Sequence, residues 1–90
     1  MDVGELYDSL VDALYEEAIP CAKNIYRLYG KSASKIYPSY HHVAVEIAFD
    51  LERKWDIPEE VIEAILDKNP IATALGRIAL FGEEESELDG

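Results

Sequence analysis

The chain has 90 residues, 49% of them hydrophobic, and a formal net charge of −11 at pH 7. A chain of this length supports one domain with one core, and its hydrophobic fraction is too high for a disordered protein. The lone Cys21 excludes an intrachain disulfide and a cysteine-rich metal site. No apolar run approaches the roughly 20 residues that cross a bilayer, and the first residues lack a signal-peptide pattern. We therefore expect a cytoplasmic protein, and the scarcity of Asn, Gln and Met is typical of a heat-adapted source.

The first third of the chain has helical periodicity. Apolar residues recur at three- and four-residue steps between Val3 and Ala18, with acidic residues between them, which predicts an amphipathic helix over residues 3–18. Pro20 lacks a backbone donor and disfavours helical geometry at Ile19, so we expect a break or kink there. A second helix should then run from Pro20 to Gly30, and residues 31–38 should form a short helical turn.

The remaining helices are predicted from apolar patterns and capping residues. Residues 39–55 are apolar on most sides, which is typical of a central helix. Asp56 and Glu59 resemble a capping box with Pro58 in the first turn, so a fourth helix should begin there. Its inward residues should be Val61, Ile62, Ile65 and Leu66.

The last helix should begin near Asn69 and Pro70 and end at Gly82. Within it, the small residues Ala72 and Gly76 leave room for the close approach of another helix. The sequence therefore predicts an all-α fold, a compact bundle of four to five short helices over residues 1–82. Residues 83–90 should form an acidic disordered tail.

The charge is distributed unevenly along the chain. Residues 1–17 contain six acids and no base, whereas residues 18–42 contain four bases and no acid. Cations beside aromatic rings can bind a phosphate, a nucleic acid or an acidic peptide. The candidate binding residues of this segment are Lys23, Arg27, Lys31, Lys35, Tyr26, Tyr29 and Tyr37.

We expect charge pairing to explain this segment better than a ligand does. An acidic row, Asp8, Asp12 and Glu16, also advances in four-residue steps on the preceding predicted helix. A hairpin of the two helices would place the rows together, and pairing between subunits would have the same effect. A protein partner is the second interpretation. Nucleic acid comes last, because the net charge of −11 opposes binding to a polyanion.

A metal site is a weaker hypothesis. His42, Glu46 and Asp50 share one face of the predicted 39–55 helix, and imidazole and carboxylate groups both bind divalent metals. One helix supplies too few ligands, and His41 points about 100° away from this face. We therefore expect these residues to form an ordinary surface row, and we expect no metal and no cofactor.

DNA reading and catalysis are also disfavoured. Residues 58–68 superficially suit the second helix of a helix-turn-helix, but three Glu and one Asp against one Lys would repel phosphates. Cys21 fits core packing better than a nucleophilic site, and no glycine-rich phosphate loop is present. We expect a non-enzymatic helical interaction module that forms a homodimer. The alternatives are an acidic decoy that mimics nucleic acid for a basic protein, and a weak metal-binding protein.

Overall fold

The computed structural model describes residues 2–83, and every regular element in this range is helical. The all-α prediction is therefore confirmed, with four longer helices and two short helical elements around one core. The elements are α1 (Val3–Tyr29), the 3-10 turn η1 (Gly30–Ser32), α2 (Ala33–Ile36), α3 (Tyr40–Trp55), α4 (Glu59–Leu66) and α5 (Ile71–Phe81). Of the acidic tail expected over residues 83–90, only Glu83 lies within the described residues.

The first helix is longer than the sequence indicated. α1 continues through Pro20 as one helix of 27 residues, so the expected break at Ile19 is wrong. A proline inside a helix costs about 3 kcal/mol, because one hydrogen bond is lost and the ring crowds the preceding turn. Pro20 lies on the exposed side of α1, while Ala18 and Ala22 on either side of it are fully buried. Burial of this face therefore offsets the local cost of the proline.

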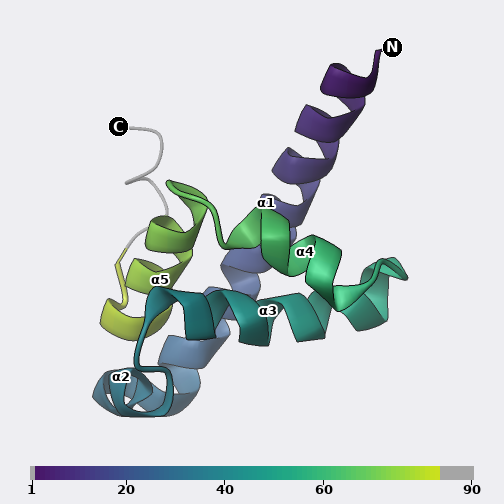
Figure 1. Cartoon of the computed structure of the whole chain (residues 1–90). Coiled ribbons are helices and arrows are strands. Elements are labelled where there is room, and N and C mark those ends of the chain that lie inside the picture. The colour runs from purple at the N-terminus through teal and green to yellow at the C-terminus, as the bar shows by residue number, and fades with distance from the viewer. Residues whose placement is uncertain (1, 84–90) are drawn as a thin grey trace.

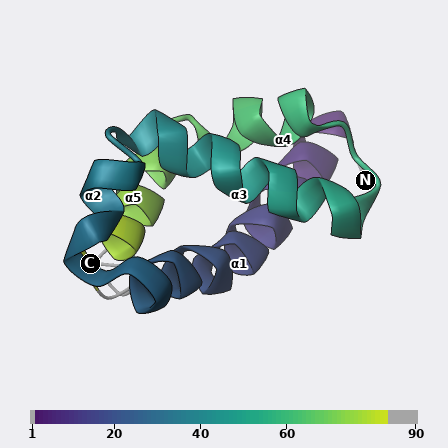
Figure 2. The same ribbon diagram turned by 90° about the horizontal axis from the view of Figure 1, so that it is seen from below.

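The third helix is central, as predicted. α3 packs against α1, α4 and α5, and its buried face contains Val43, Ala44, Ile47, Ala48 and Leu51. In Figure 1 α3 crosses α1, and in Figure 2 α2 and α5 lie together at one end of the molecule.

The corner between α3 and α4 is capped differently from the prediction. Asp56 adopts a left-handed conformation with φ 53° and ends α3, so it is not the first cap of α4. The backbone N–H of Glu59 instead donates to the Glu52 carboxylate at 2.6 Å. Val61, expected inside, is 44% exposed, whereas Ile62, Ile65 and Leu66 are buried as predicted.

Two glycines of the C-terminal part allow aromatic rings to contact the backbone. A Cβ atom on Gly76 would lie 2.0 Å from Cδ1 of Tyr40, so the room predicted at Gly76 is filled by the ring of the first residue of α3 rather than by the backbone of another helix. Gly82 ends α5 with φ 70°, and the ring of Tyr26 lies against it. These contacts fix α5 between the beginning of α3 and the later turns of α1.

Candidate functional site

The two ends of the molecule have different surfaces. The first turns of α1 extend beyond the other helices, while the last turn of α1, α2 and the end of α5 lie at the opposite end (Figure 1). The molecule is elongated, with extents of 43 × 30 × 18 Å. These two ends contain most of the exposed large apolar side chains and also the opposite charges.

At the first end, α1 exposes an apolar stripe. Val3, Leu6 and Tyr7 are 82%, 60% and 44% exposed, and we call these three residues the projecting stripe. The stripe continues along the same side of the helix into Leu10, which is half-buried, and Leu14, which is fully buried. One continuous apolar face is therefore covered by the bundle from about Leu10 onward and left uncovered before it.

The acidic row does not pair as expected. Asp8, Asp12 and Glu16 lie on the same uninterrupted helix as Lys23 and Arg27, so the predicted hairpin does not exist. All three acids are exposed. The neighbouring Glu17 accepts from Nζ of Lys54 on α3, at 2.7 Å, rather than from the basic segment. The predicted pairing of the acidic row with the basic segment through a hairpin is therefore wrong, whereas pairing between subunits stays a prediction.

At the second end, the basic side chains point into solvent. Arg27, Lys31 and Lys35 are exposed. Arg27 donates to the side chain of Asn24 within α1. Within residues 2–83, the ammonium groups of Lys31 and Lys35 contact no carboxylate within ion-pair distance. The positive charge of these lysines is therefore not neutralised inside the described part of the chain.

The tyrosines of the basic segment contribute mainly to packing. The rings of Tyr29 and Tyr37 meet edge to face, with centroids 6.2 Å apart. Burial, followed by the charge of Glu46, raises the pKa of Tyr37. Tyr26 lies against Gly82, which leaves Tyr29 as the exposed member of the predicted set.

Sequence reasoning missed the apolar side chains at the second end. Leu28, Ile36 and Phe81 are 58%, 48% and 56% exposed. A hollow of about 350 Å³ lies beside them, with Tyr37, Tyr40, Leu80 and Phe81 in its wall. We define the basic pole as these exposed apolar and basic residues: Arg27, Leu28, Tyr29, Lys31, Lys35, Ile36 and Phe81.

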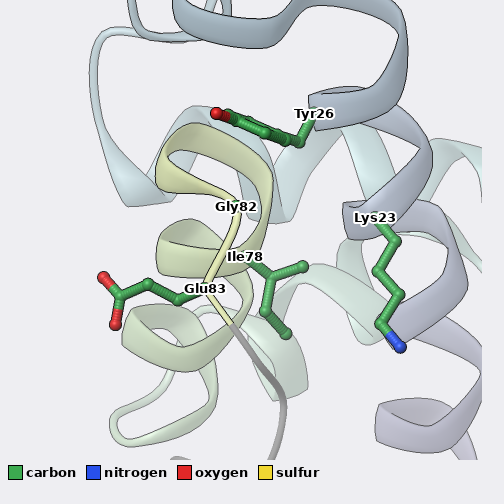
Figure 3. Close-up of a pocket in the computed structure, with 5 residues that line it drawn as sticks. All are labelled: Lys23, Tyr26, Ile78, Gly82 and Glu83. Atoms are coloured by element: carbon green, nitrogen blue, oxygen red, sulfur yellow. The ribbon is translucent and has the colours of Figure 1, made fainter.

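A second hollow lies near the basic pole. Lys23, Tyr26, Ile78, Gly82 and Glu83 line about 200 Å³ between α1 and the end of α5. In Figure 3 the Tyr26 ring lies over Gly82, and the Glu83 carboxylate points away from Lys23. Arg77 forms an ion pair with that carboxylate, with Nε to Oε2 at 3.6 Å. The polar groups of this hollow therefore do not converge on a common point.

The two histidine rings meet edge to face, with centroids 6.0 Å apart, but they bind different partners. His41 on α3 contacts α4, with Nδ1 2.8 Å from Oδ2 of Asp67 and Nε2 3.7 Å from Oε1 of Glu63. The hydrogen bond and the charge of Asp67 raise the pKa of His41. His42 instead places Nδ1 2.6 Å from the hydroxyl of Ser39, the residue that caps α3.

The candidate metal ligands His42, Glu46 and Asp50 do not form a cluster with other donors. Within residues 2–83, no group of three His, Cys, Asp or Glu side chains is placed to hold a metal ion. His42, Glu46 and Asp50 remain a row along α3. Glu46 and Asp50 both lie near Tyr37, and Asp50 also lies near Cys21.

Cys21 and Glu59 are the other titratable groups with shifted pKa values. Burial raises the pKa of the Cys21 thiol, and the charges of Asp50 and Glu17 add to this, so the nucleophilic thiolate is disfavoured. Burial also raises the pKa of Glu59, whose Oε1 is buried without a hydrogen-bond partner.

Comparisons with known proteins add no family to these observations. No protein-family model matches the chain, and no curated protein or solved structure matches it significantly. Among the helices of residues 2–83, none combines the length and apolar character needed to cross a bilayer. The geometry of the two ends is therefore the basis for the functional proposal.

Proposed function

We propose that this protein is a non-enzymatic helical interaction module that self-associates as a homodimer through the projecting stripe. The exposure of Val3, Leu6 and Tyr7 on one face of α1 supports the proposal most directly. Isolated exposed apolar residues are ordinary on protein surfaces, but three on adjacent turns form a contiguous patch. A patch of this kind on a single helix face is typical of helix docking.

The energetics favour covering this stripe. Burying a Val or Leu side chain contributes about 1.5–3 kcal/mol relative to leaving it in water. Short helical segments without tertiary packing are also marginally stable in water, because helix formation depends on an apolar face being covered. A partner that covers Val3 and Leu6 would therefore stabilise both the interface and the first turns of α1.

The remaining surface gives less support to other functions. The hollow beside Lys23 and the histidine contacts lack convergent reactive groups. An acidic decoy would use the exposed row of Asp8, Asp12 and Glu16, but it would leave the apolar stripe without a role. A cytoplasmic location suits the proposal, because a single half-buried Cys21 is compatible with reducing conditions.

Sedimentation equilibrium tests the proposal with one pair of variants. Wild-type protein should show about twice the chain mass of 10.1 kDa, and Leu6→Ser should shift the distribution to the monomer. Ser9→Ala changes an exposed, uncharged residue on another side of the same part of α1 and should retain the dimer. A monomeric wild type, or equal dimerisation of Leu6→Ser and Ser9→Ala, would contradict the proposal.

A further inference from the structure

We propose that the projecting stripe of one copy binds the basic pole of a second copy, in a twofold dimer with the two α1 helices antiparallel. This inference rests on the proposed self-association and specifies the surface that receives the stripe. A symmetric contact between two projecting stripes is the competing arrangement. Apolar area, charge and symmetry each distinguish the two arrangements.

The basic pole offers apolar surface for the stripe. Leu28, Ile36 and Phe81 are each about half exposed and come from α1, α2 and α5, which pack together at this end. The hollow of about 350 Å³ beside Phe81 is lined mainly by aromatic and aliphatic side chains. A large side chain such as Tyr7 or Leu6 of a second copy has the chemistry to occupy it. Covering both surfaces would bury apolar residues at each end of the molecule at once.

Charge favours the basic pole over a second stripe. The part of the chain that carries the stripe, residues 1–17, contains six acids and no base. Bringing two such segments together would concentrate like charges, which opposes association. Residues 18–42 contain four bases and no acid, and the ammonium groups of Lys31 and Lys35 have no carboxylate partner within residues 2–83. Contact between the stripe and the basic pole therefore brings opposite charges together.

One helix carries both halves of this interface. α1 has the stripe at its first turns, and Arg27, Leu28 and Tyr29 of the basic pole in its last turn. A helix of 27 residues is about 40 Å long, close to the 43 Å extent of the molecule. Antiparallel placement of two α1 helices would therefore set each stripe against the basic pole of the other copy. Both contacts form together, and the closed dimer leaves no free stripe for further growth.

A charge-swap experiment tests this arrangement in the full-length chain. One variant reverses the acidic end with Glu5→Lys and Asp8→Lys, and the other reverses the basic pole with Lys31→Glu and Lys35→Glu. Each variant alone brings like charges together in both contacts, so its dimer should be at least about tenfold weaker than that of the wild type. An equal mixture should form a heterodimer with attraction restored in both contacts, and its affinity should return to the wild-type range.

Two controls separate this inference from the proposed function. Arg53→Glu with Lys68→Glu makes the same change in net charge as Lys31→Glu with Lys35→Glu, but at exposed positions outside both ends, and it should dimerise like the wild type. Circular dichroism checks that every variant remains helical. If the Lys31→Glu and Lys35→Glu variant dimerises normally while Leu6→Ser is monomeric, the stripe contacts something other than the basic pole and only this inference is overturned. Failure of the mixture to recover affinity also overturns it, whereas normal dimerisation of Leu6→Ser overturns the proposed function.

Discussion

The two halves of α1 differ in what covers them rather than in their sequence pattern. Both halves repeat apolar residues at three- and four-residue steps. In what we call the second half, from Leu14 onward, Leu14, Ala18, Ala22 and Ile25 are buried against the bundle. In the first half, Val3, Leu6 and Tyr7 follow the same period but are exposed. Periodicity therefore identifies an apolar face, and only the fold shows which part of that face still lacks a partner.

The sharpest test of this comparison is a pair of truncations on α1. Leu14→Ala should lower the free energy of unfolding by about 2–5 kcal/mol, because it removes a fully buried side chain and leaves a cavity. Leu6→Ala should change the stability of the monomer by less than about 0.5 kcal/mol, because Leu6 is exposed there. Urea denaturation at high dilution measures both. Equal losses for the two variants would show that the halves of α1 do not differ as described.

A second prediction concerns the packing that covers the buried half of α1. Gly76→Ala should destabilise the protein by about 1–3 kcal/mol, because the new Cβ would overlap the Tyr40 ring and displace α3 from α5. In a Tyr40→Ala background the same change should be neutral or stabilising, because alanine favours helix over glycine. A double-mutant cycle by thermal denaturation measures the difference. Similar costs in both backgrounds would argue against ring contact as the cause.

The third prediction concerns pH and the contact between α3 and α4. The pKa of His41 is raised in the folded protein by Asp67, so protonation of this imidazole favours folding. This contribution is fully present below the pKa of the unfolded histidine and is lost as pH rises through the folded pKa. Between about pH 5 and pH 8, the wild type should therefore lose stability relative to His41→Gln. Parallel pH profiles of the free energy of unfolding for the two proteins would contradict a stabilising contact between His41 and Asp67. Dimerisation should depend on pH equally in the two proteins.

The smallest expected effect is at the acidic start of α4. Burial and the neighbouring carboxylates raise the pKa of Glu59, so its ionised form opposes folding. This group stabilises the folded state at low pH, and the contribution is lost as pH rises through the folded pKa. Glu59→Gln should therefore be slightly more stable than the wild type at neutral pH, and the difference should shrink as pH falls. Urea denaturation at several pH values measures this difference in stability. A wild type that is more stable than Glu59→Gln at neutral pH would contradict the prediction.

The sequence predicted the helical elements better than their caps and surfaces. Local periodicity predicted that α3 is a central helix, but it did not predict that Val43 and Ile47 are buried while Phe49 is exposed. The break expected at Pro20 is absent, because burial of Ala18 and Ala22 on the other side of α1 offsets the free-energy cost of a proline inside a helix. Asp56 ends α3 rather than starting α4. The N–H of Glu59 donates to the Glu52 carboxylate instead, a contact between residues seven positions apart.

The functional surfaces were predictable only in part. The charges of Lys31 and Lys35 are visible in the sequence, but the absence of the hairpin that would pair them is a property of the fold. The exposure of Leu28 and Phe81 arises because each lies at the end of its helix, where the bundle no longer covers it. The contact between His41 and Asp67 joins residues 26 positions apart, so no local pattern indicates it.

Methyl NMR over a dilution series tests the central claim that a second copy covers the projecting stripe. Methyl signals of Val3 and Leu6 should shift between about 10 µM and about 1 mM protein, a range that includes the dissociation constants of weak dimers, while Leu14 signals stay constant. Leu28 and Ile36 signals should shift over the same range if the basic pole receives the stripe. If the protein stays monomeric and the signals of Val3 and Leu6 remain constant at every concentration, a second copy does not cover the projecting stripe.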